Sequence, residues 1–233
     1  MERTLRFFHA LSVVALITVT AALVRRYLPR MSWFESATAS GLYLQTDFLF
    51  FLALTLLAAL GLMIYSRGRF WRVGLAAPIG KTWWFLLPVV IVAALAGGVV
   101  VPWEELGTLN VALQIVYAVI VIPLATELLF RGLAHGILAA GSRVQSCANR
   151  WFFSFPSVAA AIIYAFFPVF LMLWHDLIPR PGQIATVVQT IFAALALGLM
   201  AGLIRERSHS LFPGILFQAV AMLILIFLTG ALT

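Results

Sequence analysis

Long apolar runs, separated by short basic or turn-forming segments, make up most of the chain. A helix needs about 20 apolar residues to cross the hydrocarbon core of a bilayer, and most of these runs reach that length. The pattern therefore predicts an all-α fold, a polytopic transmembrane helix bundle with about seven spans. The expected spans are residues 7–24, 41–65, 83–103, 110–140, 152–177, 184–204 and 211–228.

A charged segment separates the last two apolar runs. Residues 205–209 read Arg-Glu-Arg-Ser-His and contain no apolar side chain. Charged residues at membrane depth are costly, so they usually collect in the connections between spans. We therefore expect residues 205–209 to form a tight charged turn between the sixth and seventh spans.

Composition excludes an ordinary water-soluble protein and argues against nucleic-acid binding. Of the 233 residues, 64% are hydrophobic and 10% are charged, and the mean hydropathy is +1.08. A soluble domain typically has about a quarter charged residues. The net charge is +7, but the basic residues cluster between the apolar runs, where they set topology and contact lipid headgroups. The expected partner of these charges is the lipid bilayer, not nucleic acid.

The lone cysteine, Cys147, limits the redox and metal chemistry that the chain can support. A single thiol cannot form a disulfide within the chain, and it cannot build a site of the Cys-x-x-Cys type. We also predict neither a bound cofactor nor a metal ion.

The distribution of basic residues predicts the orientation of the bundle. If the N-terminus lies inside, ten lysines and arginines fall in inner segments and four fall in outer segments. Inner loops carry the excess of such residues, so we expect a multi-pass protein of the cell (inner) membrane with a cytoplasmic N-terminus. The inner residues are Arg3, Arg6, Arg67, Arg69, Arg72, Lys81, Arg143, Arg150, Arg205 and Arg207, and the outer ones are Arg25, Arg26, Arg30 and Arg180.

One apolar run contains both a carboxylate and a guanidinium. Glu127 and Arg131 lie four residues apart in the fourth expected span, with the acid on the N-terminal side. On an α-helix this spacing and order let the two side chains meet. An ionisable residue at membrane depth is usually paired and turned into the bundle. We therefore expect a buried pair that faces protein and not lipid.

Three segments in the second half of the chain share features with a known family. They are residues 126–132 (TELLFRG), 164–168 (YAFFP) and 197–218 (LGLMAGLIRERSHSLFPGILFQ). Together they resemble the motif regions of the CPBP family, the CAAX-processing and bacteriocin-protection (Abi) intramembrane proteases. The resemblance covers about residues 111–228, half of the chain. Because the sequence shows no repeat and no second domain, we expect a single membrane domain over residues 1–233, with N-terminal spans at 1–105 and a CPBP-like core at 106–233.

The catalytic pattern of that family has three parts. Two adjacent glutamates are followed by an arginine four residues after the second; a phenylalanine is followed by a histidine four residues later; and a final histidine is followed by an asparagine or aspartate four residues later. The resemblance implies that glutamate and histidine activate a water molecule, and that the last pair stabilises the oxyanion. The corresponding positions here are Thr126, Glu127, Arg131, Tyr164, Pro168, Gln218 and Met222.

Four of these positions have altered chemistry. Thr126 has no group that accepts a proton near neutral pH, Pro168 has no side-chain heteroatom, and Met222 cannot donate a strong hydrogen bond. An amide replaces the final histidine, although it could still donate a hydrogen bond to an oxyanion. The motif remnants that keep polar chemistry are Glu127, Arg131 and Gln218.

Two histidines are candidate substitutes for those that are missing. His135 lies two helical turns beyond Glu127, and His175 follows Pro168 by seven residues. Either could serve in catalysis only if the folded helices bring its ring close to Glu127. Otherwise we expect His135 to pack or to hydrogen-bond another helix, and His175 to lie at the membrane interface.

The sequence leaves three functions open. The four departures favour a non-hydrolytic relative that binds a membrane protein or a lipidated or helical peptide. The first alternative is an active intramembrane endopeptidase of the glutamate type, with Glu127 and a displaced histidine. The second is a small transporter or channel component, with a polar path lined by Gln45, Asp47, Gln114 and Glu127.

Overall fold

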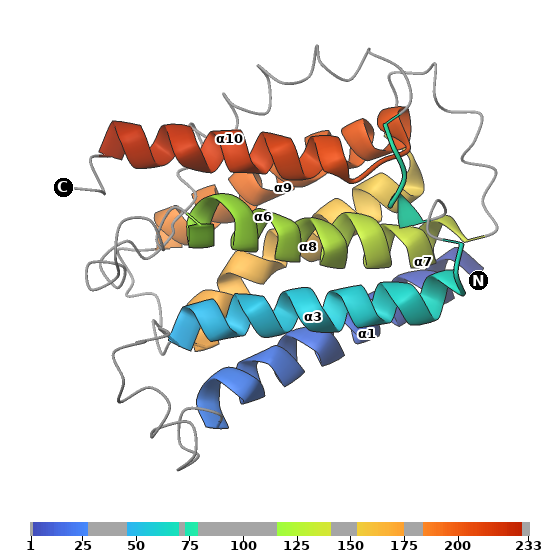
Figure 1. Cartoon of the computed structure of the whole chain (residues 1–233), viewed down its shortest axis with the longest axis horizontal. Helices are drawn as coiled ribbons and strands as arrows, with labels where there is room; N and C mark the ends of the chain where they lie inside the picture. Colours follow the sequence, from blue (N-terminus) through green and yellow to red (C-terminus); the bar gives the residue numbers. More distant parts are fainter. Residues whose placement is uncertain are drawn as a thin grey trace.

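The computed structural model describes residues 2–27, 46–69, 73–78, 116–140, 153–174 and 184–229. Within these ranges the regular secondary structure is helical, and the long helices form a bundle (Figure 1), so the predicted all-α fold is confirmed. In chain order the helices are α1 (Glu2–Tyr27), α3 (Thr46–Ser66), η5 (Tyr117–Val121), α6 (Ile122–Thr126), η6 (Glu127–Ala134), α7 (His135–Ala139), α8 (Phe155–Trp174), α9 (Ile184–Ser208) and α10 (Phe212–Thr229).

Helices occupy six of the predicted spans, and the third, residues 83–103, lies outside the described residues. α8 and α10 correspond to the fifth and seventh predicted spans. Four stretches of the described residues are long and apolar enough to cross a membrane by length and composition. These are Glu2–Tyr27, Leu49–Ser66, Val119–Ala139 and Val187–Ser208.

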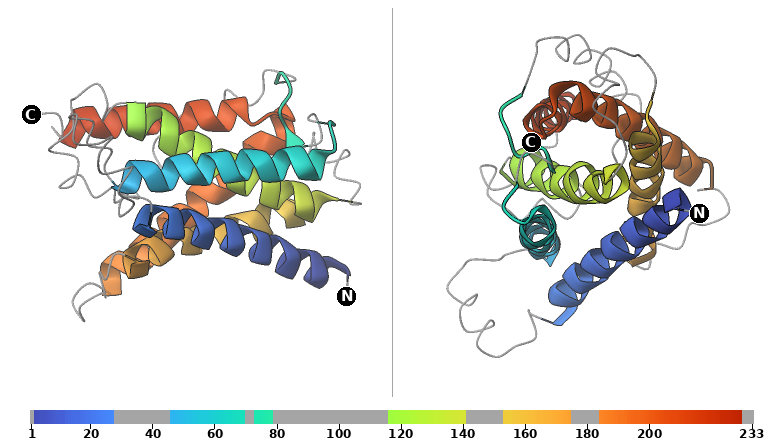
Figure 2. Two further views of the ribbon diagram at one scale, coloured as in Figure 1. Left: turned by 60° about the horizontal axis from the view of Figure 1, so that its bottom comes forward. Right: turned by 90° about the vertical axis from the view of Figure 1, so that its right-hand side faces the viewer.

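The fourth predicted span forms the centre of the bundle. Residues 117–139, which we call the central helix, run through η5, α6, η6 and α7 (green in Figure 2). In its apolar stretch 83% of the residues are buried, compared with 28% in α1. The central helix contacts α1, α3, α8, α9 and α10. Ionisable side chains on this helix therefore face other helices and not lipid.

The backbone of the central helix differs from the α-helix that the spacing predicts. It is π-helical over Tyr117–Val121 and again over Glu127–Ala134. In a π-helix the backbone hydrogen bonds connect residues five apart, and such segments occur frequently at functional sites. The second π-helical segment contains the whole Glu-Leu-Leu-Phe-Arg-Gly motif.

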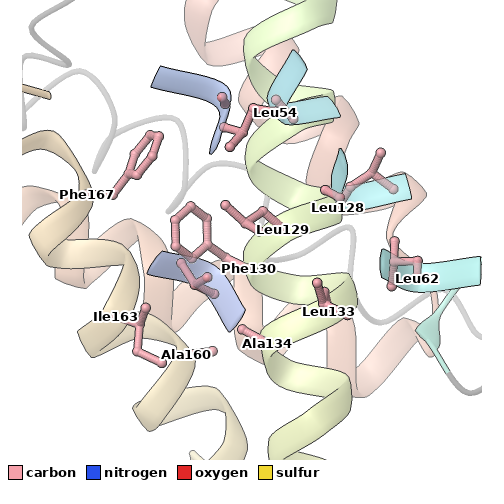
Figure 3. Close-up of a cluster of buried hydrophobic side chains, with 14 of the residues drawn as sticks. Leu54, Leu62, Leu128, Leu129, Phe130, Leu133, Ala134, Ala160, Ile163 and Phe167 are labelled. Atoms are coloured by element: carbon pink, nitrogen blue, oxygen red, sulfur yellow. The ribbon is translucent and has the colours of Figure 1, made fainter. Parts of the chain in front are cut away.

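The apolar core surrounds this motif on two sides (Figure 3). Leu133 faces Leu62 of α3, whereas Phe130 faces α8. The ring centroid of Phe130 lies 5.2 Å from that of Phe167 and 5.0 Å from that of Tyr164, both in edge-on geometry. Aromatic pairs in this arrangement contribute about 0.5–1.5 kcal/mol beyond their area burial. The core therefore fixes the rotation of the central helix about its axis.

Small residues bring the backbones of α8 and α9 close together. A Cβ atom added to Gly198 would lie 2.9 Å from the Cα atom of Ala161, and one added to Gly202 would lie 2.8 Å from the Oγ atom of Ser157. The GxxxG spacing of the two glycines permits this approach, as in other transmembrane helix pairs.

We expect the Gly198→Ala substitution to lower the free energy of unfolding by about 1–3 kcal/mol, because the new methyl group would meet backbone and force the helices apart. Gly61→Ala is the matched control. Its Cβ atom would approach the movable end of Leu133, with Cδ2 at 3.0 Å, so it should cost little. The free energy of unfolding of both variants is measured by titration with sodium dodecyl sulfate in mixed micelles, with circular dichroism as the signal. Equal losses would contradict the assigned role of the α8–α9 contact.

The predicted charged turn at residues 205–209 is wrong in its extent. α9 continues to Ser208, so Arg205 and Glu206 belong to the helix and are buried. The chain turns at His209, whose φ angle is 52°, a left-handed conformation. A neighbouring loop supports the turn, because the Leu211 N–H donates a 2.9 Å hydrogen bond to the Gly74 carbonyl oxygen. Glu206 can lie within the buried part of α9 because His135, Ser154 and Ser157 contact its carboxylate.

Candidate functional site

Glu127 is enclosed between the central helix and α10. Its side chain is 1% exposed, and its Oε1 atom accepts a 2.7 Å hydrogen bond from the Nε2 atom of Gln218. An ionised carboxylate only accepts hydrogen bonds, so the amide nitrogen must face it. Gly214, four residues before Gln218, allows the α10 backbone to approach. A Cβ atom at this position would lie 2.5 Å from Oε2 of Glu127.

Thr126 lies on the other side of the same amide. Its Oγ1 atom is 2.7 Å from Oε1 of Gln218, 2.9 Å from the carbonyl oxygen of Ile122 and 3.2 Å from that of Pro123. A hydroxyl has one proton, so it donates to one of these acceptors at a time. Gln218 therefore bridges two consecutive residues of the central helix, Thr126 and Glu127.

Arg131 completes the site on the side of α8. Its Nη1 atom lies 3.6 Å from Oε1 of Glu127, which is an ion pair that exceeds the usual 2.7–3.2 Å of an N–H···O hydrogen bond. Its Cζ atom lies 4.2 Å from the centre of the Tyr164 ring, within cation–π distance. The arginine side chain is also 1% exposed. The four-residue spacing thus joins the two charges even though the backbone between them is π-helical.

A comparison with known protein families shows which family this part of the chain resembles. The model of a family described as type II CAAX prenyl endopeptidase Rce1-like matches residues 108–224, just over half of the chain. The chain belongs to this Rce1-like family. The match includes every described part of the site and supports the resemblance to CPBP proteins, so the chain is a multi-pass membrane protein. No curated protein and no solved structure matches the chain.

The groups around Glu127 differ from the catalytic pattern that the resemblance to CPBP proteins implies. The described polar side chains in contact with it are an amide and a guanidinium, and neither accepts a proton near neutral pH. Pro168 lies within α8, and Met222 is buried in the apolar core. The arrangement can hold a carboxylate in a defined position. The described part of the site offers no second base that would activate a water molecule with Glu127.

The structure does not bring His135 to Glu127. Its Nε2 atom lies 3.3 Å from Oε1 of Glu206 on α9, and the imidazole is buried. His175, the other candidate substitute, lies outside the described residues. The structure therefore shows His135 in an interhelical contact with Glu206, which is one of the roles that the sequence allowed.

Glu206 forms the centre of a second buried polar cluster, which the sequence interpretation missed. In addition to its contact with His135, its Oε1 atom accepts a 2.7 Å hydrogen bond from the Oγ atom of Ser157 and another from that of Ser154. These partners join α7, the start of α8 and the end of α9. The sequence does contain a signal for this cluster. Gly198, Gly202 and Glu206 follow one another at intervals of four residues, which places all three on one face of the helix.

A metal centre finds no support in the part of the chain that is described. No three histidine, cysteine, aspartate or glutamate side chains come together there as ligands for an ion. Glu127 and Glu206 are instead surrounded by amide, hydroxyl, imidazole and guanidinium groups.

Proposed function

We propose that the protein is a non-hydrolytic member of the Rce1-like family, which binds a membrane protein or a lipidated or helical peptide. The main support is the hydrogen bond from the Gln218 amide to the buried carboxylate of Glu127. In the family pattern a histidine corresponds to this glutamine, and the residue that corresponds to Thr126 is a glutamate. The side chains now at these positions are hydrogen-bonded to one another through Gln218.

The chemistry of hydrolysis explains why this arrangement favours a binding role. Cleavage of a peptide bond requires a base that takes a proton from water and donors that stabilise the oxyanion. Here Oε1 of Glu127 already accepts from Gln218 and lies next to Arg131. Neither neighbour accepts a proton near neutral pH, so the described site offers no second base beside this carboxylate.

The active endopeptidase is the alternative, and it needs a histidine near Glu127. His135 is engaged with Glu206, which leaves His175 as the candidate that sequence reasoning offers. A transport function has weaker support. Of the proposed path, Gln45, Gln114 and the side chain of Asp47 lie outside the described residues, and Glu127 is enclosed.

A cleavage assay in vesicles tests the proposal. The full-length chain is reconstituted with a prenylated peptide that carries a fluorophore and a quencher on opposite sides of the scissile bond. We expect no fluorescence increase above that of protein-free vesicles, while an active family member in the same vesicles cleaves the peptide. Cleavage by the wild-type chain that is abolished in a folded Glu127→Gln variant would establish the endopeptidase instead.

The binding part of the proposal has its own measurement. Fluorescence anisotropy of a prenylated peptide, and of the same peptide without its lipid, is recorded with the purified chain in detergent. Saturable binding that exceeds the binding to empty micelles is expected for the prenylated form. Absence of binding for the prenylated peptide, the bare peptide and a hydrophobic helical peptide alike would contradict this partner class.

A further inference from the structure

Several helix ends meet at one end of the bundle, which we call the basic end. The start of α1, the end of α3, the end of α9 and the starts of α8 and α10 lie there in both orientations (Figures 1 and 2). Side-chain contacts connect them. The Cζ atom of Arg3 lies 5.9 Å from the ring centre of Phe155, and Tyr65 donates a 3.2 Å hydrogen bond to the carbonyl oxygen of Gly136. These contacts join the start of α1 to the start of α8, and the end of α3 to α7.

Among the described residues of this face, positive charge exceeds negative charge. Glu2 is exposed but pairs with Arg6, and Glu206 is buried. Burial and the nearby charge of Arg205 lower the pKa of His209, which favours the neutral imidazole. The side chains of Arg3, Arg67 and Arg69 are exposed. A turn with left-handed φ angles of 47° at Arg67 and 79° at Gly68 presents two of these arginines on either side of the glycine.

Exposed aromatic rings accompany the exposed arginines. Phe153, Phe155, Phe212 and Tyr65 all lie at the basic end and are between 37% and 55% exposed. Aromatic residues are enriched at the depth of the lipid headgroups, where one side of the ring is apolar and the other is wet. Their position indicates that the arginines beside them reach the headgroup layer.

The opposite end of α1 also carries arginines, and these can be compared with the arginines of the basic end. Arg25 and Arg26 lie in its last turn, and the Cζ atom of Arg26 lies 6.0 Å from the ring centre of Tyr27. These two arginines belong to a single helix. By contrast, the exposed arginines of the basic end come from two helix ends that a bundle holds together.

We infer that the basic end binds the phosphate headgroups of anionic phospholipids and selects them over zwitterionic ones. A guanidinium forms paired, charge-assisted hydrogen bonds with phosphate oxygens, and a net positive face favours lipids that carry net negative charge. Each basic residue near an anionic membrane surface contributes about fivefold to binding. The inference does not depend on whether the chain hydrolyses peptides.

The test counts lipids bound to the full-length chain. The purified protein is mixed in detergent with equal amounts of phosphatidylglycerol and phosphatidylcholine, and native mass spectrometry measures the ratio of retained lipids. We expect the wild type to favour phosphatidylglycerol. The double variant Arg67→Gln, Arg69→Gln should reduce that preference by at least tenfold, whereas the matched control Arg25→Gln, Arg26→Gln should keep most of it.

A charge-preserving variant separates electrostatics from folding. Arg67→Lys, Arg69→Lys should keep most of the preference for phosphatidylglycerol, and 0.5 M salt should weaken it because exposed charges are screened. A ratio near one for the wild type would overturn the inference. So would an equal loss in the two glutamine variants, or a loss in the lysine variant as large as that in Arg67→Gln, Arg69→Gln.

Discussion

Replacing Glu127 by alanine is expected to lower the free energy of unfolding by about 3–5 kcal/mol, the cost of leaving a buried charge without its partner. The guanidinium of Arg131 is 1% exposed, and without Glu127 it would keep its contact with Tyr164 but lose its carboxylate partner. The amide of Gln218 would also lose its acceptor. The measurement is the denaturation midpoint in mixed micelles, with the folded fraction followed by circular dichroism.

The chain contains a matched control for this substitution. Glu2 and Arg6 have the same residue types, the same order and the same four-residue spacing, but the Glu2 side chain is 77% exposed. Exposed ion pairs contribute about 0–1 kcal/mol, so Glu2→Ala should change stability little. The double variant Glu127→Ala, Arg131→Met removes both buried charges and should recover part of the loss. If Glu127→Ala were as mild as Glu2→Ala, the buried pair would not contribute to stability.

The arrangement of the spans follows from features that the sequence displays directly. An apolar run of sufficient length has few alternatives to a membrane helix, because backbone polar groups in lipid must be satisfied within the segment. The same cost of burial explains why Glu127 and Arg131 could be expected to pair. Both inferences rest on large energies that do not depend on the details of packing.

The π-helical backbone of the motif could not be predicted in the same way. Glu127–Ala134 contains good helix formers and one glycine, and nothing in this composition distinguishes a π-helix from an α-helix. In the folded bundle Phe130 and Leu133 of this segment pack against α8 and α3 (Figure 3). Such packing involves residues far apart in the chain, which local patterns do not report.

Gln218 illustrates a similar limit within the site. The motif alignment shows that an amide replaces a histidine, but it does not show what the amide contacts. The structure places its two ends against Thr126 and Glu127, so the substitutions complement one another in space. A pair of changes 92 residues apart becomes interpretable only when α10 is seen beside the central helix.

Glu206→Ala is expected to lower the free energy of unfolding by several kcal/mol, since a hydrogen bond to a charged group contributes about 1.5–3 kcal/mol. Its carboxylate is the shared acceptor for Ser154 and Ser157 and lies 3.3 Å from the ring of His135. Alanine would therefore leave polar groups of α7 and of the start of α8 without their common partner. The same detergent titration measures the effect.

Two further substitutions show whether Glu206 acts as the centre of this cluster. Ser157→Ala removes one donor and should cost roughly one hydrogen bond, about 1.5–3 kcal/mol. Glu206→Gln keeps a carbonyl acceptor and should fall between the wild type and Glu206→Ala. If Ser157→Ala and Glu206→Ala lost the same amount, the contacts with His135 and Ser154 would contribute nothing. This order of losses is expected only if the carboxylate of Glu206 holds α7, α8 and α9 together at the basic end, the face that carries the exposed arginines.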